Sequence, residues 1–241
     1  MLANQRLPNG GIVEPCVYCG DREGTEDDHA VGRLFFPKPK PEDLITVPAC
    51  DACNRGISKD EEYVRAVLLT LMDTENMPAA ERLRGRELRR SFEREEGKGL
   101  ANLILSSVEW VNVHTPSGTA LPDKVPIIGA DVDRMYRVLI KIVKGLYYHW
   151  KGERLPDDYE VLVYLAGLGE PFQDVLPQAI RFVAKHEVLH KIGDGSSFVY
   201  WVREGDELPD QSYWFMSFYR AVPILAATRR KKHPPRSCVV T

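Results

Sequence analysis

Residues 16–54 read CVYCGDREGTEDDHAVGRLFFPKPKPEDLITVPACDACN, and this stretch decides the fold of the N-terminal part of the chain. It lacks apolar residues at helical spacing, and Pro37, Pro39 and Pro41 alternate with other residues. Proline removes a backbone donor and favours an extended chain, so this segment cannot build an ordinary hydrophobic core. Another interaction must hold it together, and its four cysteines are the candidates.

The four cysteines form two CxxC pairs, Cys16 with Cys19 and Cys50 with Cys53. Each pair can present two thiolates to one tetrahedral metal, and two pairs complete a closed four-sulfur shell. A redox pair or unrelated thiols are the alternative, but the pairs flank a segment without a core, which favours structural zinc. We therefore predict one structural Zn²⁺ on these four cysteines and a free thiol at Cys238.

Further signals lie between and beside the pairs: Asp28-His29, Asp43-Leu44, and Asn54 directly after the second pair. Together with the cysteines, they resemble the HNH endonucleases of the ββα-metal superfamily, over residues 14–70. The resemblance implies a small zinc-bound ββα-metal module. It also implies metal-dependent hydrolysis of DNA phosphodiester bonds, with RNA as the lesser possibility.

The resemblance assigns roles to single residues. His29 would be the general base that takes a proton from the attacking water, because imidazole titrates near neutral pH. Asp28 and Asn54 would hold a catalytic Mg²⁺ or Mn²⁺ through oxygen ligands. Asp43 stands where the family usually has Asn. It either accepts a hydrogen bond from the imidazole or marks a module that has lost its activity.

Beyond the zinc loop, apolar periodicity and turn residues predict a mixture of helices and antiparallel strands. Ser58 and Glu61 form a capping box that would begin a helix, and Gly152 would end another. The expected helices cover 58–72, 79–96, 131–150 and 174–185, and the expected strands 108–114, 119–128, 159–165 and several aromatic-rich segments to about 227.

The predicted fold class is α+β, with a small zinc-bound ββα-metal (HNH) module followed by a larger mixed α+β domain. The expected boundaries are a flexible leader at 1–15, the HNH module at 16–75, the α+β domain at 76–228 and a basic flexible tail at 229–241. No apolar run approaches a membrane span and the N-terminus lacks a signal-peptide core, so we expect a cytoplasmic protein.

The formal net charge of −3 at pH 7 restricts a nucleic-acid partner to a local basic surface. We expect double-stranded DNA as this partner, and the sequence gives no indication of the oligomeric state. The candidate phosphate contacts are Lys38, Lys40, Arg82, Arg86, Arg89 and Arg90. Glutamates alternate with these arginines, so a solvated helix with internal salt bridges is the more ordinary interpretation.

Two other functions stay open. One is a catalytically silent zinc module that binds nucleic acid or protein, which would need the cysteines but not His29. The other is a zinc metalloprotease, because His186-Glu187-Val188-Leu189-His190 matches H-E-x-x-H, a motif that binds zinc when helical. However, alternation around a turn at 193–195 predicts a β-hairpin there instead of a helix.

Overall fold

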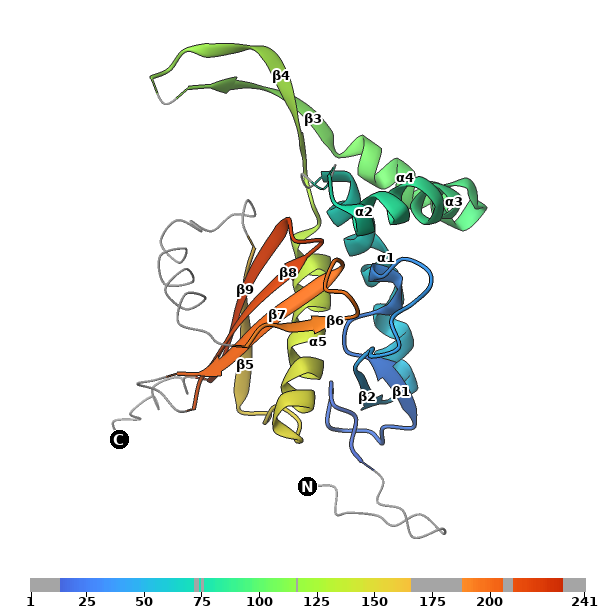
Figure 1. The fold of residues 1–241 in the computed structure, drawn as a ribbon, viewed down its shortest axis with the longest axis vertical. Helices are drawn as coiled ribbons and strands as arrows, with labels where there is room; N and C mark the ends of the chain where they lie inside the picture. Colours follow the sequence, from blue (N-terminus) through green and yellow to red (C-terminus); the bar gives the residue numbers. More distant parts are fainter. Residues whose placement is uncertain are drawn as a thin grey trace, which may run out of the picture.

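The computed structural model describes residues 14–71, 74, 76–115, 117–165, 188–205 and 210–231. These residues form a mixed α+β fold with three antiparallel sheets. In Figure 1, the central helix α5 (Val132–Lys151) lies between the N-terminal elements and the five-stranded sheet. None of the described helices combines the length and the apolarity that a membrane crossing requires.

The N-terminal part contains two short strands and a long helix: β1 (Glu26–His29), β2 (Thr46–Ala49) and α1 (Asp51–Leu71), with the 3₁₀ turn η1 (Arg33–Phe35) between the strands. β1 pairs antiparallel with β2, with His29 opposite Thr46. The helix begins at Asp51, so the predicted start at Ser58 is wrong. The amides of Cys53 and Asn54 both donate to the Cys50 carbonyl, so the second cysteine pair itself forms the first helical turn.

The predicted helix at 79–96 runs without a break from Pro78 to Glu93, as α2 (Pro78–Arg82), the π-helical η2 (Leu83–Leu88) and α3 (Arg89–Glu93). Helix α4 (Glu95–Ser106) follows it. Arg94 has an extended backbone and separates α3 from α4. The chain folds back here because Gly97 lacks a Cβ, which would overlap the carbonyl oxygen of Ser91.

A hairpin of β3 (Val108–His114) and β4 (Ala120–Ile128) follows, at the predicted position. It projects away from the rest of the chain (Figure 1). Helix α5 then runs almost as predicted: the Asp131 carboxylate accepts from the amide of Arg134 at its start, and Gly152 at φ 73° ends it.

The C-terminal sheet has the strand order β5-β9-β8-β7-β6. Its strands are β5 (Tyr159–Leu165), β6 (His190–Ile192), β7 (Phe198–Glu204), β8 (Ser212–Phe218) and β9 (Val222–Arg230). The strand at 159–165 and the hairpin around 193–195 are therefore confirmed, whereas the predicted helix at 174–185 lies outside the described residues. Arg229 and Arg230, expected in a basic tail, are the last residues of β9.

One hydrophobic core joins the N-terminal elements, α5 and the sheet. Trp150 of α5 lies edge-on against Trp214 of β8, with 5.8 Å between ring centroids. Phe35 packs on Phe218 at 5.0 Å, and the buried Tyr219 hydroxyl donates to the Phe35 carbonyl. The zinc-loop segment, which has little core of its own, is thus packed against the rest of the protein.

Gly145 of α5 permits the closest approach between this helix and the end of β1. A Cβ at this position would lie 2.7 Å from the Ala30 Cβ and 2.9 Å from the Ala30 Cα. We expect Gly145→Ala to lower the free energy of unfolding by about 1–2 kcal/mol, since overpacking a core has this magnitude.

The matched control is Gly56→Ala in α1, where a Cβ would meet nothing within 4 Å. This substitution should stabilise the protein by about 0.5–1 kcal/mol through helix propensity. Urea unfolding followed by circular dichroism measures both. Equal effects of the two substitutions would contradict the close packing of α5 on Ala30.

Candidate functional site

The four predicted zinc ligands come together, and their Sγ atoms all lie within 4.8 Å of one another. Sγ of Cys19 and Sγ of Cys50 are 3.9 Å apart. This matches a tetrahedral zinc site, in which Zn–S bonds of about 2.3 Å place the sulfurs about 3.8 Å apart. Cys16 and Cys50 are buried, and Cys19 and Cys53 are partly buried. The cluster is therefore compatible with one bound zinc ion.

The turns around the cysteines are built to hold such a cluster. Gly20 has φ 72° and donates its amide to the carbonyl of Cys16, which closes the first turn. A hydrogen bond with the Cys50 sulfur raises the pKa of Arg22. This guanidinium therefore offsets part of the thiolate charge, as outer-shell partners of metal ligands do.

Asp28 and His29 occupy the end of β1, where successive side chains point to opposite faces of the strand. Asp28 is only 8 % exposed and points toward α5, whereas His29 is partly buried. The Asp28 Oδ2 atom lies 2.8 Å from Nζ of Lys141. The resemblance gave no role to this lysine, which comes from α5.

Lys141 joins three elements beneath His29. The residue is only 6 % exposed, and its ammonium group donates to Glu61 Oε1 of α1 at 2.6 Å and to the carbonyl oxygen of His29 at 3.2 Å. Burial raises the pKa of Glu61, and the charge of Lys141 opposes this effect. Burial and then the charge of Asp28 raise the pKa of the neighbouring Tyr18.

The imidazole of His29 is suited to accept a proton. Burial, followed by the nearby charge of Arg33, lowers its pKa. The ring is therefore neutral at pH 7. Its Nδ1 atom is buried and has no hydrogen-bond partner among the described residues. Arg33 is the exposed first residue of η1 and would add positive charge for a phosphate near this ring.

Asn54 lies in the first turn of α1 and turns toward β1. Its Nδ2 donates to Oε2 of Glu26 at 2.7 Å. Arg55 also pairs with Glu26, at 3.6 Å. The amide hydrogen bond leaves Oδ1 of Asn54 as its remaining ligand atom. Carboxylate and amide oxygens from β1 and α1, on Glu26, Asp28 and Asn54, are hard donors of the kind that Mg²⁺ and Mn²⁺ bind.

Asp43 does not contact the imidazole of His29, contrary to one of the two expectations for it. Both of its carboxylate oxygens accept from the amide of Gly193, at 2.8 and 2.9 Å. The reason is the packing of the Pro-rich loop on the β6–β7 turn, where Pro41 lies against Gly193. Asp43 thus ties the zinc loop to the C-terminal sheet.

Several predicted phosphate contacts are engaged in internal interactions. Lys40 donates to the Phe36 carbonyl and lies 3.6 Å from Glu87. Arg89 pairs with Glu93 at 3.1 Å, as expected for a solvated helix with internal salt bridges. These side chains give little support to a phosphate-binding row.

The part of the H-E-x-x-H motif that the structure describes, residues 188–190, is not helical. His190 begins strand β6, pairs with Tyr200 across the sheet and stacks on its ring with 4.8 Å between centroids. Val188 and Leu189 have no regular structure, and His186 and Glu187 lie outside the described residues. The geometry at His190 does not provide the helical spacing of the protease motif.

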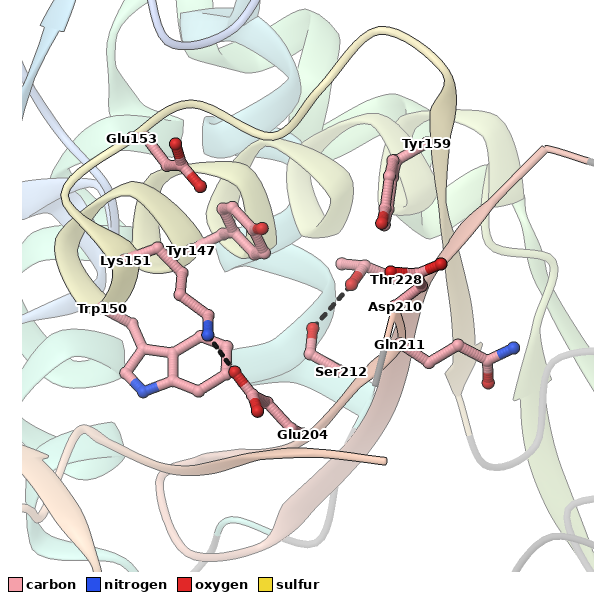
Figure 2. A pocket seen from close by; sticks show the side chains of 10 residues that line it. All are labelled: Tyr147, Trp150, Lys151, Glu153, Tyr159, Glu204, Asp210, Gln211, Ser212 and Thr228. Atoms are coloured by element: carbon pink, nitrogen blue, oxygen red, sulfur yellow. Dashed lines mark hydrogen bonds and ion pairs between the residues drawn. The ribbon is translucent and has the colours of Figure 1, made fainter. Parts of the chain in front are cut away.

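A separate cavity of about 110 Å³ lies between the end of α5 and the sheet. Figure 2 shows the residues that line it. Lys151 pairs there with Glu204 and lies over the ring of Trp150, while Ser212 and Thr228 share a buried hydrogen bond of 2.6 Å. Four of its polar lining residues are thus paired with one another. None of the predicted site residues lines this cavity.

Sequence reasoning missed Tyr18, Arg33 and Lys141 and assigned Glu61 only to a helix cap. One signal was visible: Lys141 interrupts the apolar stripe of its helix between the buried Val138 and Ile142. A charged residue on a buried face needs a partner of opposite charge. The identity of that partner depends on tertiary packing and could not be read from the sequence.

No model of a known protein family matches the chain. No curated protein and no solved structure matches it either. The HNH interpretation therefore depends on the residues and the geometry described above.

Removal of a zinc ligand should unfold the N-terminal part. We expect purified wild-type protein to retain one zinc per chain after dialysis and to melt at lower temperature with a chelator. Cys53→Ser should lose the metal, whereas Cys238→Ser should retain it. Elemental analysis and thermal unfolding measure both, and equal zinc contents in the two variants would contradict the four-cysteine site.

His190 should make the fold sensitive to acid. Burial, followed by the charge of His149, lowers its pKa. The unfolded chain therefore binds a proton at about pH 6.5, above the pKa of the folded state, so stability is lost as pH falls below about 6.5. Urea unfolding of His190→Gln should show a smaller fall between pH 7 and 5.5 than wild type. His114→Gln, on exposed β3, is the control and should retain the full fall.

Proposed function

We propose that the chain is an HNH-type, metal-dependent endonuclease that hydrolyses DNA phosphodiester bonds. The observation that carries this proposal is the arrangement of β1, β2 and α1 around the cysteine cluster. It puts Asp28 and His29 at the end of one strand and Asn54 at the start of the adjoining helix. This is the ββα order that the HNH resemblance implies.

The oxygen donors of β1 and α1 support a divalent-cation site. Asp28 would supply a carboxylate oxygen and Asn54 its Oδ1, with the amide held by Glu26. A bound Mg²⁺ or Mn²⁺ would stabilise negative charge on the phosphate and on the leaving oxygen. The chain's own part is to hold these ligands in place and to keep the cation beside the imidazole of His29.

His29 would be the general base. Its lowered pKa keeps the ring neutral at pH 7, so the imidazole can take a proton from an attacking water molecule. Proton transfer to the ring leaves hydroxide-like oxygen to attack phosphorus. Arg33 would attract the phosphate of the substrate, because it is exposed and its charge reaches His29.

A catalytically silent zinc module that binds nucleic acid or protein is the second candidate. One observation favours it: Asp28 is already paired with Lys141. An aspartate balanced in this way attracts a divalent cation less strongly than a free one. The two candidates differ in their need for His29, and a cleavage experiment separates them.

The test is nicking of supercoiled plasmid by the full-length, zinc-loaded protein, with Mg²⁺ or Mn²⁺ and with chelator. We expect His29→Ala to slow metal-dependent nicking by about 10²–10⁴-fold, the usual contribution of a general base. His114→Ala changes a histidine of the β3–β4 hairpin and should nick like wild type.

Absence of nicking by a folded, zinc-loaded wild type, with every metal and with both duplex and single-stranded DNA, would contradict the nuclease proposal. Gel-shift binding by the same protein would then support the silent module. Nicking that His29→Ala retains would indicate either a contaminating nuclease or a different base.

A further inference from the structure

A buried ammonium group lies directly behind the residues to which we assign catalysis. Nζ of Lys141 is 2.8 Å from Asp28 Oδ2, 2.6 Å from Glu61 Oε1 and 3.2 Å from the carbonyl oxygen of His29. The lysine belongs to α5, Glu61 to α1, and the other two to β1. One nitrogen therefore links three elements at the proposed site.

The charges of this cluster do not balance. Lys141, Asp28 and Glu61 are 6, 8 and 7 % exposed, so solvent screens them little. With all three ionised, two carboxylates face one ammonium group. The excess negative charge lies on the side of β1 that carries the proposed cation ligands, and a bound cation would balance it.

Lys141 is the charged partner of Asp28 in this cluster. Its Nζ atom donates to Glu61 and to the backbone of His29, and it lies within ion-pair distance of Asp28 Oδ2, at 2.8 Å. The charge of the ammonium group therefore restrains the position of the carboxylate.

Two glycines allow the surrounding backbone to approach this cluster closely. A Cβ at Gly32 would lie 2.8 Å from Glu61 Oε2, and Gly145 lets α5 approach Ala30, the residue after His29. The ring of Tyr18 lies 5.5 Å from Nζ of Lys141 and covers another side. Close packing on these sides fixes the position of the ammonium group.

We propose that Lys141 is a positioning residue, which holds the Asp28 carboxylate and the His29 backbone in the arrangement that binds a divalent cation. This inference rests on the proposed function. It places part of the nuclease site in α5, outside residues 14–70 that carry the HNH resemblance. The N-terminal segment alone would therefore hold an incomplete site.

The test compares Mn²⁺ binding by wild type and by the double variant Glu61→Gln/Lys141→Met. This variant removes one negative and one positive charge, so the net charge of the cluster is unchanged, while Asp28 loses the ammonium group that holds it. Replacing a buried ion pair by neutral groups of similar size is usually tolerated by the fold. Circular dichroism and zinc content check that the variant is folded.

We expect the double variant to bind Mn²⁺ about 10- to 100-fold more weakly in a titration followed by electron paramagnetic resonance, as for other outer-shell partners of metal ligands. Plasmid nicking should slow correspondingly at a fixed Mn²⁺ concentration. Asp28→Asn should remove the same binding event. The matched control, Asp60→Asn/Arg137→Met, breaks a more exposed pair of 2.8 Å that also joins α1 and α5, and it should bind Mn²⁺ like wild type.

Mn²⁺ binding that is unchanged or tighter in the folded double variant would overturn the positioning role. If that variant does not fold, Lys141→Arg replaces it, since arginine keeps the charge but moves the donor atoms. A fall in Mn²⁺ affinity would then support the role, and unchanged affinity would overturn it.

The same measurements separate this inference from the proposed function. Nicking that needs His29 but is indifferent to the double substitution refutes only the role of Lys141. A wild type that neither nicks DNA nor binds Mn²⁺ through Asp28 refutes both.

Discussion

The convergence of four cysteine sulfurs is the constraint on which the N-terminal part of this protein depends. Thirty residues lie between the two CxxC pairs, and their buried side chains, such as Phe35 and Phe36, pack into the core shared with the rest of the chain. A metal shared by the pairs would supply the cross-link that this loop lacks. The second pair also forms the first turn of α1, so the cluster sets the start of the helix relative to β1 and β2.

Helix α5 and the C-terminal sheet also hold the N-terminal segment in place. Helix α5 packs against the end of β1 through Gly145 and Ala30, and it delivers Lys141 to Asp28. The C-terminal sheet fixes the Pro-rich loop from the other side, where Asp43 accepts from the amide of Gly193. The resemblance to HNH endonucleases covers less than a third of the chain, yet the candidate site draws on elements from the whole of it.

Local patterns predicted those elements whose periodicity is strong. The apolar stripe of α5, its end at Gly152 and the strand at 159–165 appear where expected. The helix expected at 79–96 is present up to Glu93, but its break at Arg94 and the glycine-dependent fold-back at Gly97 have no periodic signature and were not predicted.

At the candidate site, too, local sequence patterns predicted some features and could not predict others. Cysteine spacing predicted the cluster, since two CxxC pairs constrain one metal geometry. The partners of Asp28 and Asp43 could not be predicted, because Lys141 and Gly193 approach them from positions more than a hundred residues away in sequence.

Anomalous X-ray diffraction would test the account's central claim most directly. The crystals would contain His29→Ala, zinc, Mn²⁺ and a short DNA duplex that the variant leaves uncleaved. Data at the zinc and manganese edges should place zinc among the four cysteine sulfurs and manganese against Asp28 and Asn54, with a DNA phosphate beside position 29. Manganese or DNA bound only elsewhere, with Asp28 still held by Lys141 alone, would contradict the nuclease assignment and leave a zinc-bound binding module.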